Sequence, residues 1–161
     1  MTRSIRPRVS HENSLYFSHL KYDYSRNSEE AIPFPDVLAD LKDHVESRLG
    51  KEKDTLNFAL VNLYRDGNDR IGAHRDNEAQ IDASAGIASV SFGATRDFVF
   101  KPYKPYKPEA GDKRRIVAPL EHNSLFYFEK EAIFDWTHEV PTRKRVKGPR
   151  VNVTFRRVFE K

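Results

Sequence analysis

The stretch "PRVNVTFRRVF", residues 149–159, alternates polar and apolar side chains through its first half. Side chains two positions apart on an extended strand point to the same side, so this alternation predicts a β-strand with two unlike faces. One face carries only apolar side chains, those of Val151, Val153 and Phe155. The opposite face carries only polar ones, which are Arg150, Asn152, Thr154 and Arg156. We therefore expect a strand that packs against a core on one side.

Further short runs upstream have the same β character. They are "LNFALVNLYR" (56–65), "GIASVSFGA" (86–94), "RDFVFK" (96–101), "RRIVAPL" (114–120) and "NSLFYFE" (123–129). Turn residues separate alternating or β-branched runs, which is typical of antiparallel sheets. A sandwich or jelly roll with one helix packed outside is the simplest arrangement, so the predicted class is mainly β with a flanking helix.

The flanking helix is predicted over "IPFPDVLADLKDHVESRLG", residues 32–50. Pro35 and Asp36 suit a first helical turn, and Gly50 suits the position after the last turn. Apolar residues recur at helical spacing and form one stripe. That stripe consists of Val37, Leu38, Leu41, Val45 and Leu49.

Composition limits the remaining choices. A length of 161 residues suits one domain, 1–161. The net charge of +4 and the pI of about 9.3 favour polyanionic partners such as nucleic acid. Cysteine is absent, which excludes disulfides and thiolate-bound metals. No apolar run approaches the roughly 20 residues of a membrane span, and no signal sequence is visible. We expect an intracellular monomer without a membrane partner.

Two connecting segments are strongly basic: "KPYKPYKPEAGDKRR" (101–115) and "PTRKRVKGPR" (141–150). One interpretation is a pair of solvated loops. The other is a pair of segments that bind nucleic-acid phosphates, with Tyr103 and Tyr106 available to stack on bases or sugars. The run "RKRVK" also fits a nuclear address, which is a weak signal.

The stretch "IGAHRDNE", residues 71–78, places His74 and Asp76 two positions apart. In an extended segment both side chains would face one metal ion, although a polar turn at a strand end is the alternative. A third ligand would have to come from the remaining histidines, which are His11, His19, His44, His122 and His138. His44 lies on the predicted helix and His122 in a predicted turn. Two histidines and one carboxylate form the facial triad of non-heme Fe(II) oxygenases.

The polar face of the 149–159 strand suggests an anionic ligand. Two arginines, Arg150 and Arg156, would share this face with an amide and a hydroxyl between them. Guanidinium groups are costly to bury without anionic partners, and each offers a bidentate fork to a carboxylate. A dicarboxylate would satisfy both, whereas a solvated polar face is the alternative.

Four blocks together resemble a known family. They are "VNLYRDGNDRIGAHRDNE" (61–78), "IASVSFGATRDFVFK" (87–101), "WTHEVP" (136–141) and "GPRVNVTFR" (148–156). In this order they resemble the AlkB-type Fe(II)/2-oxoglutarate dioxygenases, and most of all the eukaryotic subgroup that repairs alkylated bases in double-stranded DNA. The resemblance implies a double-stranded β-helix (jelly roll) dioxygenase core over 54–159. It also implies that residues 1–32 are part of a nucleotide-recognition lid.

The resemblance assigns cofactor roles to eight residues. Iron would be held by His74, Asp76 and His138. Arg150 would pair with the distal carboxylate of 2-oxoglutarate, supported by hydrogen bonds from Asn62, Tyr64 and Asn152. Arg156 would lie near the metal-chelating end of 2-oxoglutarate and would also pair with Glu78. The implied cofactors are Fe(II) and 2-oxoglutarate, with O2 as cosubstrate.

The resemblance also suggests a base pocket. In "YDYS", residues 22–25, Tyr24 would stack on the flipped base opposite His74, with Tyr22 and Ser25 as polar neighbours. Packing in an edge strand is the alternative for these tyrosines. The residues next to the iron motif, Arg75, Asn77 and Glu78, complete the predicted pocket. Asn77 stands where close relatives often have a second acidic residue, which would shift preference between alkylated adenine and cytosine.

The implied activity is oxidative demethylation of bases of the 1-methyladenine and 3-methylcytosine type in DNA, with release of formaldehyde, succinate and CO2. The same chemistry on RNA and a low-turnover nucleic-acid-binding module remain alternatives. The apolar finger of the double-strand-specific members would precede "YDYS", and we expect it to be missing here. A truncated form or an unpaired substrate would follow from that. Localisation would be nuclear in a eukaryote.

Overall fold

Two antiparallel sheets face each other in the computed structural model, which describes residues 14–18, 32–103 and 114–159. The first sheet has the order β1 (Ser14–Ser18), β2 (Phe58–Tyr64), β9 (Arg150–Arg156), β4 (Ile87–Gly93) and β7 (Ser124–Phe128). The second has the order β3 (Ile71–His74), β8 (Trp136–Val140), β5 (Arg96–Pro102) and β6 (Ile116–Leu120). The mainly β class with a jelly-roll core is therefore confirmed.

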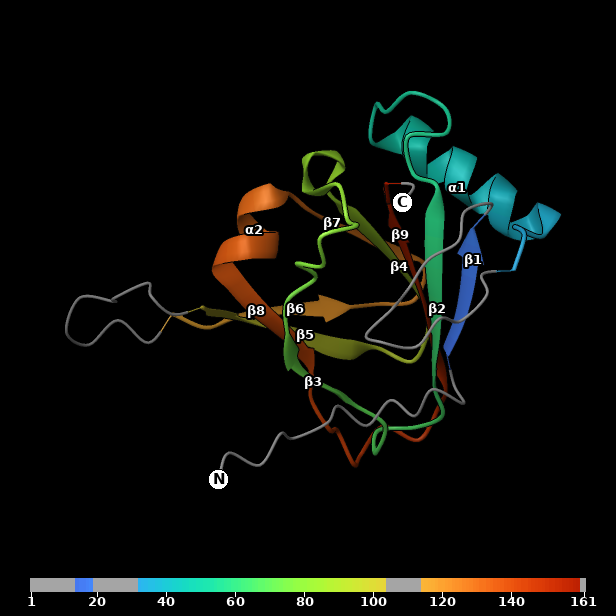
Figure 1. Cartoon of the computed structure of the whole chain (residues 1–161). Helices are drawn as coiled ribbons and strands as arrows, with labels where there is room; N and C mark the ends of the chain where they lie inside the picture. The colour runs from blue at the N-terminus through green and yellow to red at the C-terminus, as the bar shows by residue number, and fades with distance from the viewer. Residues whose placement is uncertain (1–13, 19–31, 104–113, 160–161) are drawn as a thin grey trace.

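The helices lie on different parts of this sandwich. Helix α1 (Asp36–Arg48) lies next to β1 and β2, and the short α2 (Lys130–Asp135) lies beside β8 (Figure 1). Buried side chains of α1 pack against apolar side chains from the first sheet. This core includes Leu38, Val45, Ala59, Ala88, Val90, Val153 and Phe155. The outer face of the first sheet is therefore closed by α1, and its inner face looks toward the second sheet.

Strand β9 lies in the middle of the first sheet, paired with β2 on one side and β4 on the other. Its apolar residues Val153 and Phe155 pack in the core under α1, as the alternation predicted. Its polar residues face the space between the sheets and are buried. The alternative of a solvated polar face is wrong, because the second sheet covers that side.

Helix α1 begins at Asp36 after Pro35 and ends at Arg48. Gly50 has a φ of +65°, a left-handed conformation that favours glycine after a helix. The residues predicted to form the apolar stripe are buried or half-buried, except Val37, which is 77% exposed. At 100° per residue, Val37 lies roughly 80° from the centre of the stripe, so its side chain points past the sheet. His44 lies on this helix, as predicted, and is exposed.

Strands β1, β3 and β8 and helix α2 were not among the predicted regular elements. The three strands have only four or five residues each, and α2 has six. Such short segments carry too few positions for a periodic pattern to stand out. The turn predicted at His122 is present. Among the described residues, no helix is long and apolar enough to cross a membrane.

Some predictions fall outside the described residues. These concern His11, His19, Tyr22, Tyr24, Ser25, Tyr106 and most of the basic segment 101–115. The single domain 1–161, and its division into a lid and a core, also stay predictions. Within the proposed lid, β1 is described, and it pairs with β2 at the edge of the first sheet.

Candidate metal and cosubstrate site

Three candidate metal-ligating side chains meet between the two sheets. Strand β3 ends at His74, Asp76 follows two residues later, and β8 carries His138 directly opposite His74 in the antiparallel pairing. Their potential ligand atoms all lie within 4.8 Å of one another. His74 Nε2 is 3.6 Å from Asp76 Oδ1, and His138 Nε2 is 3.8 Å from Asp76 Oδ2. One cation between them would contact two imidazoles and one carboxylate.

The electrostatics of this group suit a cation. His74 Nδ1 lies 2.8 Å from the carbonyl oxygen of Gly72, so an N–H at Nδ1 donates to that oxygen and leaves a lone pair on Nε2. Burial lowers the pKa of His138 to about 4, which keeps its imidazole neutral at neutral pH. Burial alone would raise the pKa of Asp76, but the positive charge of Arg156, together with smaller contributions from His138 and His74, outweighs the effect of burial, so the pKa lies below its usual value.

Two buried polar atoms of this group lack hydrogen-bond partners among the described residues: Asp76 Oδ1 and His138 Nδ1. The first faces His74, where a metal ion would satisfy it. His138 is instead oriented by packing. The ring centroids of Phe98, Phe100 and Phe128 lie 5.2, 5.8 and 5.5 Å from that of its imidazole. Neutral imidazoles and a carboxylate are the donors that Fe(II) accepts in oxygenases, so the residues fit this ion.

The neighbouring part of the cavity is built by register across β2, β9 and β4. Arg150 lies opposite Tyr64, and Asn152 lies opposite Asn62. Arg150 Nη2 donates to Ser91 Oγ at 2.9 Å on the β4 side. Arg150 is 1% exposed, and its Nε and Nη1 have no hydrogen-bond partner in the described part of the chain. A buried guanidinium with two open donors calls for an anion.

One further arginine beside this group was missed by the sequence analysis. Arg96 is 1% exposed, and its Cζ lies 5.6 Å from the centroid of the Tyr64 ring, whereas that of Arg150 lies 5.0 Å away. Its signal was present in the run "RDFVFK", where Arg96, Phe98 and Phe100 alternate on one side of the predicted strand. A charged side chain in line with two core aromatics indicates a special position.

Arg156 connects the two parts of the site. Its Nη2 donates to Asp76 Oδ2 at 2.8 Å, and both side chains are buried. The predicted pairing of Arg156 with Glu78 stays a prediction. Burial raises the pKa of Glu78, and its Oε2 has no partner among the described residues.

A single cavity joins these groups. It is lined by all three candidate metal ligands, His74, Asp76 and His138, and by the polar row Asn62, Tyr64, Arg150, Asn152, Thr154 and Arg156. Its apolar wall consists of Leu60, Ile71, Phe98, Leu120, Phe128 and Val140. The predicted cofactor residues therefore come together, with metal donors, arginines and an apolar wall in one space. Such a cavity suits a divalent cation chelated by a small dicarboxylate.

The predicted base-pocket residues are less closely grouped. Arg75, Asn77 and Glu78 do not belong to the described residues that line the cavity. The guanidinium carbon of Arg75 lies 3.5 Å from the centroid of the Tyr103 ring, and its Nη1 donates to the Phe134 carbonyl at 3.1 Å. Asn77 is exposed and Glu78 is half-buried. Their role in base binding stays a prediction.

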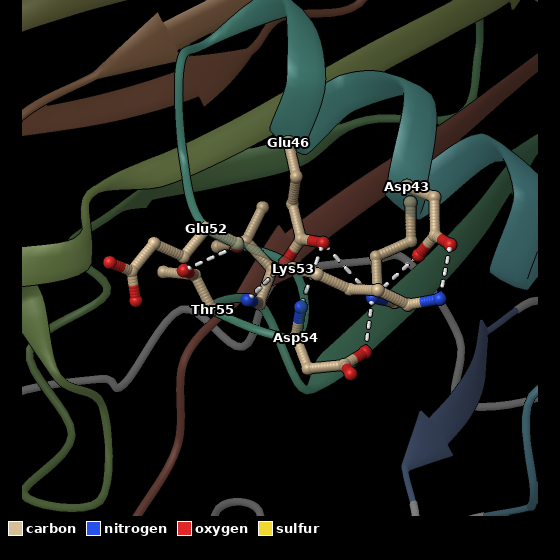
Figure 2. A network of polar contacts seen from close by, with 8 residues as sticks. Asp43, Glu46, Glu52, Lys53, Asp54 and Thr55 are labelled. Atoms are coloured by element: carbon tan, nitrogen blue, oxygen red, sulfur yellow. Dashed lines mark hydrogen bonds and ion pairs between the residues drawn. The ribbon is translucent and has the colours of Figure 1, made fainter.

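A second acidic group, Asp43, Glu46 and Asp54, lies in the C-terminal half of α1 and in the loop that follows (Figure 2). Lys42 Nζ reaches carboxylate oxygens of all three, at 2.8 to 3.0 Å. An ammonium group already occupies the position that a metal ion would take. This cluster is therefore an ion-pair network.

Comparisons with known proteins agree with this geometry. The sequence profile of the 2OG-Fe(II) oxygenase superfamily matches residues 3–156. The human DNA oxidative demethylase ALKBH2 is 42% identical over 142 residues, which cover 87% of this chain and 53% of that protein. The human alpha-ketoglutarate-dependent dioxygenase alkB homolog 3 is 39% identical over 150 residues, which cover 91% and 51%. The chain thus spans about half the length of the curated relatives it matches.

Among solved structures, that of OsALKBH1 aligns with a TM-score of 0.60 at 18% identity and covers 89% of this chain and 77% of the other. At that identity the match supports the fold alone. The resemblance to AlkB-type dioxygenases is confirmed by the family profile and the two human relatives.

Proposed function

Because the chain belongs to the 2OG-Fe(II) oxygenase superfamily, we propose that it is an Fe(II)/2-oxoglutarate-dependent dioxygenase that demethylates N-alkylated bases in DNA. One observation carries the proposal: His74, Asp76 and His138 line the same cavity as the buried, partly unpaired guanidinium of Arg150. The first group suits Fe(II), and the second suits the distal carboxylate of 2-oxoglutarate.

Each group in the cavity has a defined task. His74, Asp76 and His138 would hold Fe(II), and bound Fe(II) with 2-oxoglutarate would supply the oxidation of an N-alkyl carbon by O2. Arg156 keeps one oxygen of Asp76 engaged, so the other oxygen is left for the metal. The aromatic wall around His138 excludes water from this side of the site.

Dicarboxylate binding is the task of the other part of the cavity. Arg150 offers two open donors, and Ser91 fixes the orientation of its guanidinium. Tyr64, Asn62 and Asn152 line the same part of the cavity and would add hydrogen bonds to the distal carboxylate. Among the described residues no carboxylate pairs with Arg150, so its charge stays available for the ligand.

Alkylated DNA is the proposed substrate, with formaldehyde, succinate and CO2 as products. The human relative named DNA oxidative demethylase supports this choice. So do the exposed side chains of Lys144, Arg145 and Lys147, because phosphate contacts dominate nucleic-acid affinity. Their loop is fixed to the β2–β3 loop by a backbone bond from Gly67 N to the Val146 carbonyl, at 2.8 Å. Work on DNA would place the protein in the nucleus of a eukaryote.

The decisive experiment combines binding and turnover. Under anaerobic conditions with Fe(II) and 2-oxoglutarate, the purified protein should give the weak visible charge-transfer band of the chelated pair. With O2 and a methylated DNA oligonucleotide it should release formaldehyde. His74→Ala should lose the band and the formaldehyde while keeping the salt-dependent DNA affinity, because the basic loop is untouched.

Two results would contradict the proposal. A folded protein that never gives the band would lack a competent cofactor site and would fit a nucleic-acid-binding module. A clear preference for a methylated RNA of the same sequence would show that the substrate is RNA.

A further inference from the structure

Arg96 stands in an unusual position at the start of β5. The inward row of this strand contains Arg96, Phe98 and Phe100, and the two phenylalanines pack around His138. A guanidinium in this row is 1% exposed, although burial of a charge without an ionic partner is strongly unfavourable. A leucine or a phenylalanine at this position would continue the apolar core without burying a charge.

Three backbone carbonyl groups hold the guanidinium of Arg96. Nη1 donates to the carbonyl of Asp66 at 2.9 Å, and Nη2 donates to those of Asp69 and Pro141, each at 2.8 Å. These acceptors are neutral. No ion pair of Arg96 with a carboxylate occurs among the described residues, so its positive charge is solvated by dipoles and is not cancelled.

The three carbonyls belong to segments that carry the site. Asp66 lies two residues after Tyr64 at the end of β2, and Asp69 lies two residues before β3, the strand that ends at His74. Pro141 directly follows β8, the strand of His138. One side chain therefore ties together the ends of the strands that carry a cosubstrate residue and both metal-ligating histidines.

Tyr64 is the link between Arg96 and the cavity. Its ring is 2% exposed, and the guanidinium carbons of Arg96 and Arg150 lie 5.6 and 5.0 Å from its centroid. Arg150 and Tyr64 line the cavity, whereas Arg96 lies behind them. Two buried positive charges beside one tyrosine make this part of the cavity favourable for an anion. The effect is largest for a ligand whose negative charge lies next to Tyr64.

We propose that Arg96 is a positioning residue for the dicarboxylate cosubstrate. From outside the cavity it fixes Tyr64 and the strand ends around it, and its charge adds to that of Arg150 where the distal carboxylate binds. The inference rests on the proposed function in taking 2-oxoglutarate as the ligand. It goes further in assigning recognition of the distal carboxylate to a side chain that never touches it.

The test compares two ligands and two buried cations. Arg96→Met removes the charge and the clamp at similar volume, and Lys42→Met removes a buried cation on the outer face of the sandwich. Each protein, loaded anaerobically with Fe(II), is titrated with 2-oxoglutarate and with 2-oxobutyrate, which lacks the distal carboxylate. The charge-transfer band reports binding, so the readout does not require turnover.

We expect Arg96→Met to weaken 2-oxoglutarate binding about three- to thirtyfold, the range for residues that act through a network. Binding of 2-oxobutyrate should change by less than about twofold, because its chelating end does not meet Arg96. Lys42→Met should leave both affinities within about twofold, since it is remote from the cavity. Arg96→Lys keeps the charge without spanning all three carbonyls, so it should recover part of the 2-oxoglutarate affinity.

The outcomes separate this inference from the proposed function. Equal weakening of both ligands in Arg96→Met would indicate a general distortion of the site and would overturn the inference. Unchanged 2-oxoglutarate binding would overturn it as well. If Arg96→Met does not fold, Arg96→Lys decides alone, and the inference then requires a loss for 2-oxoglutarate larger than that for 2-oxobutyrate. A wild-type protein that binds no 2-oxoglutarate would instead defeat the proposed function.

Discussion

Two buried charged clusters of this protein differ in how completely they satisfy themselves. On the outer face, Lys42 is 6% exposed, and its ammonium contacts three carboxylates. These belong to Asp43, Glu46 and Asp54, which are labelled in Figure 2. Glu46 is also fully engaged: Oε2 accepts from Lys42 and from the Asp54 amide, and Oε1 accepts from the Leu56 amide at 2.6 Å. These four residues, Lys42, Asp43, Glu46 and Asp54, form the closed cluster, which joins α1 to the loop before β2. Lys42 and Glu46 have no charge without a partner in it.

The cluster on the inner face, which consists of Asp76, Arg96 and Arg150, is the open cluster, because its charges are only partly matched. Within the described part of the chain, Arg150 keeps two unpaired donors, Asp76 keeps one unpaired oxygen, and Arg96 has only neutral carbonyl partners. Buried polar groups are normally satisfied, so the unsatisfied ones need an explanation. A buried charge alone therefore says little about function. The charges that the chain leaves unmatched are the ones that indicate a ligand.

The largest contrast is expected from Arg150→Met. The variant should bind 2-oxoglutarate at least about a hundredfold more weakly, because it loses a charge-assisted fork to the distal carboxylate. Without metal and 2-oxoglutarate, however, its free energy of unfolding should not fall, and it should rise by up to about 1 kcal/mol, since an uncompensated buried charge is gone. Urea denaturation of both proteins with and without the ligands measures the two effects.

Without ligands Arg150→Met should be at least as stable as the wild type, and with Fe(II) and 2-oxoglutarate the wild type should be the more stable, because the ligands stabilise only the protein that binds them. A variant that is destabilised by about 2 kcal/mol without ligands would show that Arg150 supports the fold. The open cluster would then be structural like the closed one, and the comparison would fail.

The opposite change in the free energy of unfolding is expected from Lys42→Met. Removal of this ammonium leaves the buried carboxylate of Glu46 with amide partners only, and we expect the free energy of unfolding to fall by about 2 kcal/mol. Ligand affinity should stay at the wild-type value. Urea denaturation and a 2-oxoglutarate titration check the two statements. A variant as stable as the wild type would show that the closed cluster contributes nothing.

The sequence predicted more of the open cluster than of the closed one. Alternation along 149–159 correctly placed the four polar residues of β9 on one face, and Asn62 and Tyr64, which lie two positions apart in β2, line the same cavity. Local geometry suffices there, because each strand has a period of two. The third candidate metal ligand, His138, was different. From the residues alone it stayed open among several histidines, because the pairing of His74 with His138 depends on the register between β3 and β8.

The closed cluster gave no such signal. Lys42 lies in a helix whose charged residues are expected on the solvated side, yet the loop that follows α1 brings Asp54 over it. This loop turns through Asp54 itself, which has a φ of +61°, an uncommon conformation outside glycine. Tertiary closure of this kind has no periodic trace in a sequence. Arg96 lies between these cases: the sequence analysis missed it, although the alternation in β5 carries a signal for its inward position, and no local pattern reveals its carbonyl partners.

The smallest expected effect is a dependence of the closed cluster on alkaline pH. Burial alone would lower the pKa of Lys42, but its hydrogen bonds to Asp54, Asp43 and Glu46 raise it above the ordinary value of 10.5. A group whose pKa is raised in the folded state contributes its full stability below the unfolded pKa and loses it as the pH rises through the folded pKa. The stability difference between wild type and Lys42→Met should therefore stay constant from about pH 7 to 9 and shrink above about pH 10.5.

Arg150 provides the control for this pH dependence. A guanidinium keeps its proton throughout this range, so the difference between wild type and Arg150→Met should not change where that of Lys42→Met shrinks. Urea denaturation of the three proteins at about pH 7, 9 and 11 measures both differences. If the Lys42 difference persists undiminished at the highest pH, the ammonium is not what holds the closed cluster together. Its stability would then come from the backbone amides bound to Glu46, which do not titrate.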